Sequence, residues 1–406
     1  MKLLKDIYHF LYAWLGNIIY RFPSRKIFVI GITGTKGKSS VVELLTTILE
    51  SVGKHVAVLS STRMKVGAQD EKNQTENTMP GRFFIQKFLR DAVDAGCEFA
   101  IIEVTSQGVL QHRHRFIDFD AALFLNIHPE HIEAHGSYET YRGAKLKFFS
   151  DVFRFSRKEK KLFFINRLDK EADRFSLAVS GGEIVYFNRE TFIKDRFLGK
   201  ANTLGDWFSY DFNLENAALA AAVGEQLGVS REQIVKAFKS FSGFPGRMDI
   251  VQEKPFRIVV DYAHTPDSLE AVYKALSGTR GKKLICVLGS CGGGRDAWKR
   301  PVFGKIASAY CKSIIITDED PYDESPEKIM QEIISGLSEE KKKLLEEPRA
   351  TGGVWKIIDR KAAINHAKSI AKKGDIVVIT GKGSENSIHI KNGEKIPWSD
   401  REAALS

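Results

Sequence analysis

Short apolar runs alternate with helix-period stretches in the first half of the chain. Four runs have the length and the Ile, Val, Phe and Ala content of buried strands, and they span residues 27–30, 56–59, 99–104 and 121–125. Between two of them, residues 84–93 place apolar side chains three and four positions apart, as an amphipathic helix does. Such alternation predicts a mostly parallel sheet with helices on both faces, and ligands of such sheets gather at the carboxyl ends of the strands.

The same alternation starts again after residues 243–246, a Gly/Pro-rich stretch that is a candidate hinge. Its predicted strands span residues 258–260, 284–288, 314–317 and 376–379. Each is followed by a polar segment that contains glycine or acidic residues. The charged run 338–347 is interpreted as a solvated helix. Two α/β domains that meet near residue 245 are therefore expected.

Residues 2–22 follow helical spacing but are mostly aromatic and aliphatic, with little polar face. The uncharged run 7–20 is shorter than the ~20 residues that a bilayer-spanning helix needs, and no small-residue cleavage site follows. The pattern favours a helix that packs on the body of the protein. A helix that docks on a membrane surface or on a partner protein is the alternative. We expect a cytoplasmic protein, with a peripheral position at the inner membrane face as the variant.

The strand predicted at residues 27–30 leads into a glycine-rich turn and then a helix. Glycines allow several backbone N–H groups to converge on a phosphate, and the helix N-terminus adds its dipole. Lys38 would reach the β- and γ-phosphates, and the Ser39 hydroxyl would bind Mg²⁺. The strict P-loop spacing is not met, because Ile32 stands where the first glycine belongs. The phosphate-binding residues predicted here are Gly34, Thr35, Gly37, Lys38, Ser39 and Ser40.

These patterns predict an α/β fold. A central P-loop ATPase domain with a mostly parallel sheet would span residues 25–245, and a C-terminal Rossmann-like α/β domain would span 246–406. A hydrophobic helix, residues 1–24, would precede both.

A formal net charge of +10 favours an anionic partner such as a nucleotide, a phosphorylated substrate or an acidic membrane. Most basic residues are interspersed with acids and no nucleic-acid-binding motif accompanies them, so no nucleic-acid partner is expected. The four cysteines form no C-x-x-C pair. We expect reduced thiols in a cytosolic chain, with neither a disulfide nor a zinc site.

Three polar segments are placed at predicted strand ends in the first domain, at residues 103–113, 126–136 and 141–145. They contain carboxylate, hydroxyl and imidazole groups. Mg²⁺ bound to a triphosphate takes one or two carboxylates in addition to phosphate oxygens and water. These segments therefore predict a magnesium site beside the phosphate cradle.

From about residue 25 to 406, the chain resembles the Mur ligase family, ATP-dependent amide-bond ligases of cell-wall synthesis. The family's P-loop, G-T-x-G-K-[ST]-[ST], is matched by Gly34 to Ser40. Within the family, the chain is most similar to the branch that adds the third amino acid to UDP-N-acetylmuramoyl-L-alanyl-D-glutamate. The resemblance implies ATP, Mg²⁺, an amino acid and an acyl-peptide as the molecules that are bound.

The resemblance also implies roles for individual residues. Those associated with the metal or with catalysis are Lys38, Ser39, Glu103, His131 and Lys145, the last as a carbamoylated lysine that should be sheltered from water. Those that contact the nucleotide beyond the P-loop are Asn213, Asn216, Arg247 and Asp261. Those that contact the acyl substrate are Asn77, Thr78, Ser106 and Arg113, and those of the amino-acid pocket are Asp320, Tyr322, Gly381 and Glu385.

Two departures from the family pattern bear on the substrates. Tyr322 stands where the diaminopimelate branch has an arginine, and a phenol cannot form the bidentate pair of a guanidinium with a carboxylate. The neighbouring acids Asp320, Asp323, Glu324 and Glu385 would instead favour a second ammonium, as on lysine. Only some two dozen residues precede the P-loop strand where relatives have a uridine-nucleotide-binding domain. The acceptor is therefore expected to be held by a partner or to carry no UDP.

The expected reaction transfers the γ-phosphate to a substrate carboxylate, and an amine then attacks the acyl phosphate. Two alternatives remain at this point. One is a ligase with the same mechanism and another γ-glutamyl acceptor, such as a folyl-polyglutamate synthase or a cyanophycin-type enzyme. The other is a weakly catalytic nucleotide-binding scaffold that docks through residues 2–22.

Overall fold

The computed structural model describes residues 2–75, 77–128, 136–194, 204–278, 284–294, 296–346 and 352–406. The chain forms two compact units, residues 1–242 and 243–406, and each is described by itself. Among the described residues, we find no helix that combines the length and the apolar character needed to cross a bilayer.

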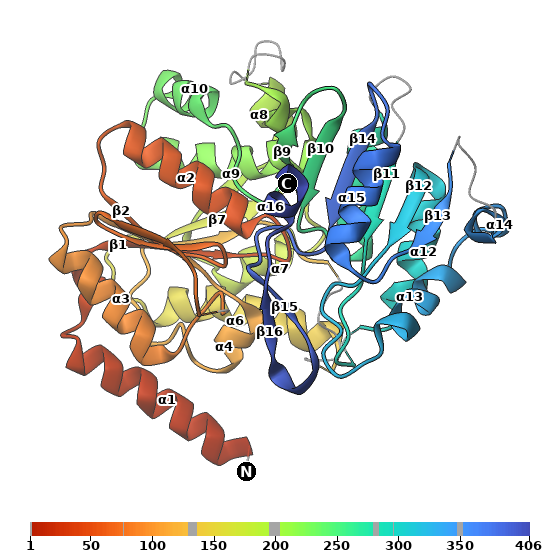
Figure 1. Ribbon diagram of the computed structural model, residues 1–406. Helices are drawn as coiled ribbons and strands as arrows, with labels where there is room; N and C mark the ends of the chain where they lie inside the picture. The colour runs from red at the N-terminus through yellow and green to blue at the C-terminus, as the bar shows by residue number, and fades with distance from the viewer. Residues whose placement is uncertain are drawn as a thin grey trace. The chain divides into compact units, whose positions relative to one another are not determined.

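The first unit is built on one eight-stranded sheet with the order β4-β3-β2-β5-β1-β6-β7-β8 (Figure 1). The strands are β1 (Phe28–Thr33), β2 (Val56–Leu59), β3 (Arg63–Val66), β4 (Gln69–Lys72), β5 (Phe99–Glu103), β6 (Ala121–Phe124), β7 (Leu162–Asn166) and β8 (Glu183–Phe187). All neighbours pair in parallel except β3 and β4, which extend the sheet as antiparallel strands at the β2 edge. The four strands predicted in this half are confirmed, and the mostly parallel sheet with them.

Helices cover both faces of this sheet, as the alternation of strands and helices predicts. The described helices are α1 (Lys2–Ile19), α2 (Lys38–Ser51), α3 (Arg82–Asp94), α4 (Ser106–Leu110), α6 (Tyr138–Phe155), α7 (Ala172–Ala178), α8 (Arg189–Lys194), α9 (Asp211–Gln226) and α10 (Arg231–Ser240), with the 3-10 turns η1 (Pro23–Lys26) and η3 (Asp206–Ser209). Figure 1 shows α2, α9 and α10 on one side of the sheet and α3 and α6 on the other. Alternate strand residues such as Val29 and Ala57 join Phe88, Phe148 and Phe175 in the core beneath α3, α6 and α7.

Helix α1 lies against α3, so the expectation of a helix packed on the body of the protein is confirmed for one of its sides. Ala13, Gly16 and Asn17 form the buried side, and a Cβ on Gly16 would be in ordinary contact with Phe83 and Gln86 of α3. The rings of Tyr12 and Phe83 meet edge to face, 5.1 Å apart. The small size of the α1 residues at this contact allows the two helix backbones to approach closely.

The second unit has a six-stranded sheet with the order β13-β12-β11-β14-β10-β9, parallel except for β9. Its strands are β9 (Asp249–Gln252), β10 (Arg257–Asp261), β11 (Leu284–Leu288), β12 (Cys311–Ile316), β13 (Val354–Lys356) and β14 (Ile376–Thr380), and β15 (Ser387–His389) pairs with β16 (Lys395–Pro397) in a separate hairpin. The helices are α11 (Pro266–Ser277), α12 (Lys299–Tyr310), α13 (Pro326–Ser335), α14 (Glu339–Glu346), α15 (Arg360–Ile370) and α16 (Asp400–Leu405), with the 3-10 turn η4 (Lys391–Gly393). The four predicted strands and the charged helix are confirmed.

The prediction that all cysteines are reduced is wrong for two of them. Cys286 on β11 and Cys311 at the start of β12 form a disulfide, with their Cα atoms 6.0 Å apart. These strands are parallel neighbours, so residues 25 positions apart in sequence come side by side. Such a pair leaves no short-range spacing signal in the sequence. Cys97 and Cys291 are not part of this disulfide.

Candidate active site

The glycine-rich turn lies between the end of β1 and the start of α2, as predicted. Gly37 is the N-cap of α2 with φ +81°, and a Cβ there would collide with the Asn216 amide oxygen of α9. Both the positive φ and the lack of space for a Cβ require a glycine at this position. Asn126, which follows β6, supports the turn by accepting hydrogen bonds from the backbone N–H groups of Thr35 (3.2 Å) and Lys36 (3.0 Å). The turn is therefore held from β6 and α9 as well as from its own strand and helix.

The two lysines singled out in the sequence meet at this turn. The Lys38 ammonium donates to the carbonyl oxygens of Gly34 (3.0 Å) and Thr35 (3.1 Å). The Lys145 ammonium, from α6, donates to the same Gly34 oxygen at 2.8 Å. Lys145 is only 2% exposed, and its nitrogen lies 4.7 Å from the ring centroid of Tyr141. A buried lysine at the phosphate turn is thus brought in by a helix more than 100 residues further along the chain.

Ser39 and Glu103 form the second contact at the turn. Glu103 is the last residue of β5 and is 1% exposed, and its Oε1 accepts from Ser39 Oγ at 2.8 Å. The same oxygen accepts from the backbone N–H of Ser61 at 3.1 Å, and the Ser39 and Ser61 hydroxyls are 3.0 Å apart. A buried carboxylate beside two hydroxyls offers only oxygen ligands, which suits a hard cation such as Mg²⁺.

Among the residues that the structure describes, we find no group of three or more His, Cys, Asp or Glu side chains arranged to hold a metal ion. A magnesium ion that takes most of its ligands from phosphate and water needs no such cluster. The predicted ligand His131 lies outside the described residues.

The predicted acyl-substrate residues come from two segments that the structure joins. Arg113 donates to the Met79 carbonyl oxygen, directly after Thr78, and also to the Gln111 side chain at 2.7 Å. Partial burial lowers the pKa of the Arg113 guanidinium from its usual value. Ser106 is buried at the first position of α4, whereas Asn77 is exposed and bonds its own turn through the Thr75 carbonyl oxygen.

The two asparagines of α9 differ in what they contact. Asn216 lies against Gly37 and so belongs to the phosphate turn. Asn213 is 2% exposed and donates to the Trp207 carbonyl oxygen at 2.7 Å, which fastens η3 to the start of α9. In this structure, Asn213 therefore acts as a local brace.

In the second unit, Asp261 at the end of β10 binds its own backbone. Its two carboxylate oxygens accept from the N–H groups of Met248 (2.7 Å) and Ala263 (2.8 Å). Burial raises the pKa of the Asp261 carboxyl, against the opposing charge of Arg247. The Arg247 guanidinium lies over the Tyr262 ring, 4.2 Å from its centroid. The predicted nucleotide-contacting pair thus lies on one corner of this sheet.

Residues of the predicted amino-acid pocket are joined through Lys382, which is fully buried. Its ammonium bonds both oxygens of Asp320 at 2.8 Å and also pairs with Glu385. Glu385 in turn accepts from the Tyr262 hydroxyl at 2.9 Å. The second ammonium-binding role expected for Asp320 and Glu385 is therefore filled within the chain by Lys382.

The two other acids of that expectation are also engaged in the structure. Glu324 pairs with Arg300 at 3.0 Å, and Asp323 accepts from the backbone N–H of Asn392 at 3.0 Å. Tyr322, in the position of the arginine, stacks on His389 with ring centroids 5.1 Å apart. The phenol therefore lies against the β15–β16 hairpin.

Glu319 is the acid of this region that sequence reasoning did not select. It is 4% exposed, and its Oε2 has no hydrogen-bond partner among the described residues. Burial raises its pKa, while Arg360 and Lys299 favour its charged form. Gly381, with φ +111°, leaves room for it, because a Cβ there would collide with the Glu319 carboxylate.

A buried ion pair supports both loops of this pocket from behind. Arg360 at the start of α15 forms a bidentate pair with Asp400 of α16, at 2.7 and 2.8 Å. The same guanidinium donates to the carbonyl oxygens of Asp318 (3.0 Å) and Thr380 (2.8 Å), the residues directly before Glu319 and Gly381.

From the sequence, Asn126 was singled out only as the first residue of the polar segment 126–136, and Lys382 was assigned no role of its own. Asn126 directly follows the predicted strand 121–125, whereas Lys382 is the third residue after the predicted strand 376–379; a position shortly after a strand is the signal that could have drawn attention to them.

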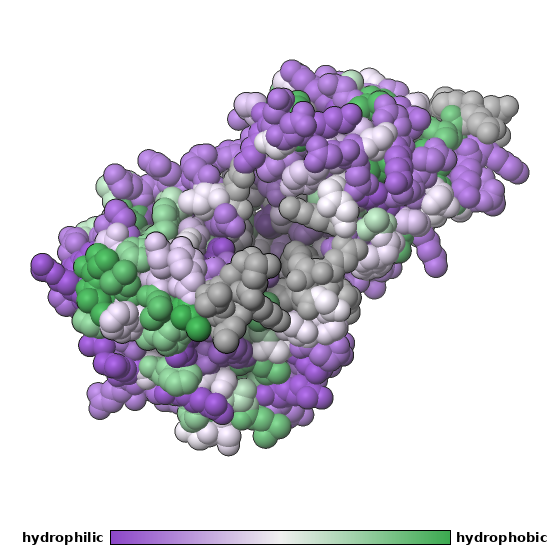
Figure 2. Space-filling view, turned by 90° about the horizontal axis from the view of Figure 1, so that it is seen from below, coloured by the Kyte–Doolittle hydropathy of each residue, from purple (hydrophilic) through white to green (hydrophobic). Residues whose placement is uncertain are grey.

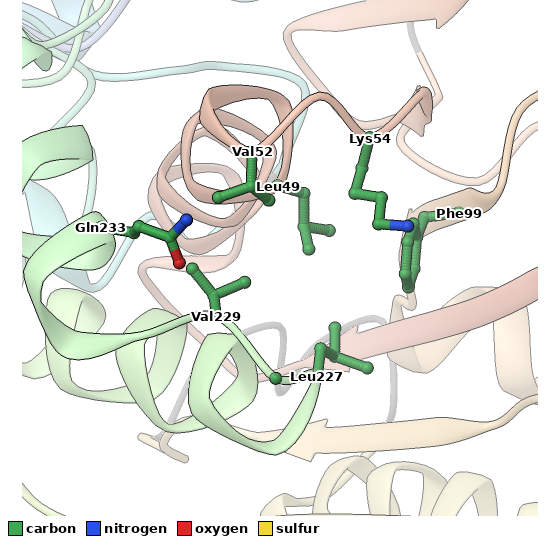
Figure 3. A pocket seen from close by; sticks show the side chains of 8 residues that line it. Leu49, Val52, Lys54, Phe99, Leu227, Val229 and Gln233 are labelled. Atoms are coloured by element: carbon green, nitrogen blue, oxygen red, sulfur yellow. The ribbon is translucent and has the colours of Figure 1, made fainter.

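A small cavity of about 190 Å³ lies elsewhere in the first unit (Figure 3). Its lining includes Leu49 and Val52 near the C-terminal end of α2, together with Phe99 at the start of β5. These are the ends opposite to those that carry Lys38 and Glu103. The cavity contains none of the predicted site residues, so the chemistry does not lie there.

Comparisons with known proteins agree with this geometry. The model of the Mur ligase middle domain matches residues 32–213, and that of the Mur ligase, glutamate ligase domain, matches residues 246–383. A UDP-N-acetylmuramoyl-L-alanyl-D-glutamate--2,6-diaminopimelate ligase of Aquifex aeolicus (strain VF5) is 32% identical over 408 residues, covering 95% of this chain and 79% of that protein.

Two solved structures give the same picture. A UDP-N-acetylmuramoyl-L-alanyl-D-glutamate--2,6-diaminopimelate ligase, 28% identical, matches 93% of this chain and 78% of its own with a TM-score of 0.58. Mycobacterium tuberculosis folylpolyglutamate synthase complexed with ADP and AMPPCP has a TM-score of 0.67 over 91% of this chain and 92% of its own. At 15% identity, the second likeness shows the fold alone. The family models, the relative and the P-loop geometry lead to one conclusion: the chain belongs to the Mur ligase family.

Proposed function

We propose that this chain is an ATP-dependent ligase that joins an amino acid to the carboxylate of a muramoyl-dipeptide-like acceptor in peptidoglycan precursor synthesis. The observation that carries the proposal is the convergence of Lys38 and Lys145 on the Gly34 carbonyl, with Ser39 and Glu103 paired on the same turn. A family member that keeps this arrangement has the parts needed for phosphoryl transfer.

In this proposal, the backbone of residues 34–40 holds the phosphates of ATP and Lys38 stabilises the charge of the group that is transferred. Asn216 sets the position of the turn through Gly37. The acceptor carboxylate attacks the γ-phosphorus, the bond to the ADP oxygen breaks, and an acyl phosphate forms. The amine of the incoming amino acid then attacks the acyl carbon and phosphate leaves, with one proton released.

Ser39 and Glu103 would hold Mg²⁺, which supplies neutralisation of phosphate charge when bound. The fit rests on their all-oxygen surroundings and on the burial of Glu103. His131 completes the set of proposed metal ligands from the sequence resemblance.

Lys145 would carry a carbamate. Its ammonium first loses one proton, and the neutral amine then forms a nitrogen–carbon bond with carbon dioxide and releases a second proton, so a positive group becomes a negative one. Burial suits this chemistry, because an apolar environment disfavours the charged amine. The Tyr141 ring and the 2% exposure of Lys145 are the features that support it.

For the substrates, we assign Asn77, Thr78, Ser106 and Arg113 to the acyl acceptor, since Arg113 brings its own loop to the segment that follows Thr78. Asp261 and Arg247 would contact the nucleotide, and Asn213 would act indirectly through its helix. Asp320, Tyr322, Gly381 and Glu385 would form the amino-acid pocket.

A ligase that consumes ATP works where ATP is supplied, so we place the reaction in the cytoplasm. Contact with the inner membrane face through residues 2–22 is part of this proposal.

The test is phosphate release from ATP with a panel of amino acids and a muramoyl-L-alanyl-D-glutamate acceptor, with and without its UDP group. We expect release that needs both the acceptor and an amino acid and that is lost in Lys38→Ala. Release with a folate and glutamate, but with neither muramoyl acceptor, would replace this proposal by a folyl-polyglutamate synthase. Absence of ADP formation with every pair would indicate a scaffold.

A further inference from the structure

Helix α1 turns its bulky apolar side outward, whereas most surface helices turn that side toward the protein. Its buried residues Ala13, Gly16 and Asn17 are small or polar, and they lie on α3. Its bulky apolar residues are exposed; Leu11, for example, is 52% exposed, and Phe10 and Tyr12 among them also contact rings of the protein, those of Phe116 and Phe83. At about 100° per residue, the exposed side chains cover an arc of about 200° and the buried ones occupy the remainder. Surface helices of water-soluble proteins normally turn the apolar side inward.

The exposed patch is large compared with the rest of the surface. Among the described residues, 18 large hydrophobic side chains are exposed, and nine of them belong to this one helix. Figure 2 shows hydrophobic residues gathered over this part of the first unit. The nine that form the α1 patch are Ile7, Tyr8, Phe10, Leu11, Tyr12, Trp14, Leu15, Ile18 and Ile19. Contiguous apolar surface of this extent marks a contact site.

The shape of the α1 patch favours a lipid surface over a protein helix. A helix that pairs with another helix needs a narrow stripe, whereas the α1 patch covers more than half of the circumference. An interfacial helix buries such a broad face in the boundary between head groups and acyl chains. Tyr8, Tyr12 and Trp14 combine an apolar ring with a polar group, the chemistry that is enriched at membrane interfaces.

The charge around the α1 patch indicates which lipids it would contact. Residues 1–26 contain five lysines and arginines and a single acid, Asp6. Arg21 and Lys26 are exposed just beyond the C-terminal end of α1, and Lys2 and Lys5 belong to its first turns. Basic residues beside an apolar face are attracted to anionic head groups.

We propose that α1 lies flat in the surface of an anionic lipid membrane and holds the protein there through the α1 patch. This inference deepens the membrane contact included in the proposed function by naming the helix face and the class of lipid, and it does not depend on the proposed reaction, because the α1 patch contains none of the proposed catalytic residues.

The test is co-sedimentation of the full chain with vesicles of phosphatidylcholine alone or mixed with phosphatidylglycerol. The double variant Leu11→Glu/Leu15→Glu places two charges at the centre of the α1 patch. Leu177→Glu is the matched control, because Leu177 is 75% exposed on α7 of the same unit. Circular dichroism and ATP turnover, which should be unchanged in both variants, confirm that they are folded.

We expect the wild-type chain and Leu177→Glu to bind the mixed vesicles, and the double variant to bind at least roughly ten-fold less. High salt should weaken the binding, because it screens the basic residues. The proposal is overturned if the wild-type chain stays in the supernatant with both vesicles, or if the double variant binds as well as the control. It is also overturned if light scattering shows a dimer that only the double variant dissociates, while no form binds vesicles.

Discussion

Lys38 and Lys145 donate hydrogen bonds to one and the same atom, the carbonyl oxygen of Gly34. Two ammonium groups on one carbonyl repel each other, so the arrangement favours an anion between them or the loss of one positive charge. Both outcomes are part of the proposed chemistry: phosphate is the anion, and a carbamate on Lys145 removes the charge.

The first prediction concerns this carbamate. With ¹³C-bicarbonate, the wild-type protein should show a carbamate signal by ¹³C NMR that is absent in Lys145→Arg. Turnover in that variant should fall at least roughly 100-fold, because a positively charged group replaces a metal-positioning anion. Lys147→Arg, on the exposed side of the same helix, is the control and should keep both the signal and the activity. A signal that survives in Lys145→Arg would assign the carbamate to another lysine.

The second prediction concerns the metal. Glu103→Gln keeps the shape of the side chain and its contacts with Ser39 and Ser61 but removes the negative charge. The Mg²⁺ concentration for half-maximal turnover should therefore rise about ten-fold or more. A titration of turnover with Mg²⁺ at saturating ATP measures it. Glu98→Gln, exposed at the opposite end of the same strand region, should leave the titration unchanged. An unaltered Mg²⁺ requirement in Glu103→Gln would remove Glu103 from the metal site.

The third prediction distinguishes the effect of backbone strain on stability from the effect of a distorted phosphate turn on ATP binding. Gly37 and Gly53 flank α2, and both have positive φ (+81° and +79°), but only at Gly37 would a Cβ collide with a neighbour, Asn216. Alanine at either position should cost about 1–2 kcal/mol in the free energy of unfolding. Only Gly37→Ala should also weaken ATP binding, by about ten-fold or more. Urea unfolding and nucleotide titration compare the two, and equal ATP affinities would contradict the assignment of the turn.

The fourth prediction concerns the incoming amino acid. The Glu319 oxygen that has no hydrogen-bond partner among the described residues lies beside Gly381, and we expect it to accept a hydrogen bond from the substrate ammonium. Glu319→Gln should raise the KM for the amino acid about ten-fold and leave the KM for ATP unchanged. Because burial raises the pKa of Glu319, the wild-type KM should increase with falling pH earlier than an ordinary carboxyl would cause. Glu327→Gln, an exposed carboxylate at the start of α13, is the control. Equal rises in both KM values would indicate a structural role instead.

The fifth prediction concerns stability and pH. Burial alone would raise the pKa of Asp151 on α6, but hydrogen bonds from His114 and Lys147 outweigh it and lower the pKa to about 2. A depressed pKa stabilises the fold above the ordinary value near 4, and this stabilisation is lost as the pH falls through about 2. Asp151→Asn should therefore be about 1–2 kcal/mol less stable at neutral pH, with the difference closing in acid. Urea unfolding across this range measures it, and a pH-independent difference would contradict the ion-pair origin.

Some of the site could be predicted because it depends on local pattern. Lys38 and Ser39 follow a strand and open a helix, so their places are set by the turn itself. Glu103 and Asp261 are each the last residue of a strand, so each lies at the carboxyl edge of its own sheet. Lys145 was selected from the order of motifs that the chain shares with the family. Its contact with Gly34 is a tertiary contact, which the spacing of apolar residues does not predict.

Other features depend on packing between distant segments. Asn126, after β6, bonds the backbone of Thr35, and Asn216 of α9 lies against Gly37. In each contact the two residues are far apart in the sequence, so neither could be predicted from the neighbourhood of the other. Cys286 and Cys311 meet only because β11 and β12 are neighbours. Asp320, which follows β12, and Glu385, which follows β14, both bind the ammonium of Lys382, and this contact was not expected from the sequence. Pairing between loops is decided by strand order, which the single sequence leaves open.

The Arg360–Asp400 pair gives the final helix an unexpected importance. The Arg360 guanidinium bonds Asp400 of this helix and also the backbone of the two loops around Glu319 and Gly381. Residues 400–406 therefore help to position the proposed amino-acid pocket, although they contribute no side chain to it. Trimming this short tail, or fusing a bulky tag to it, would blur substrate choice before it unfolded the domain.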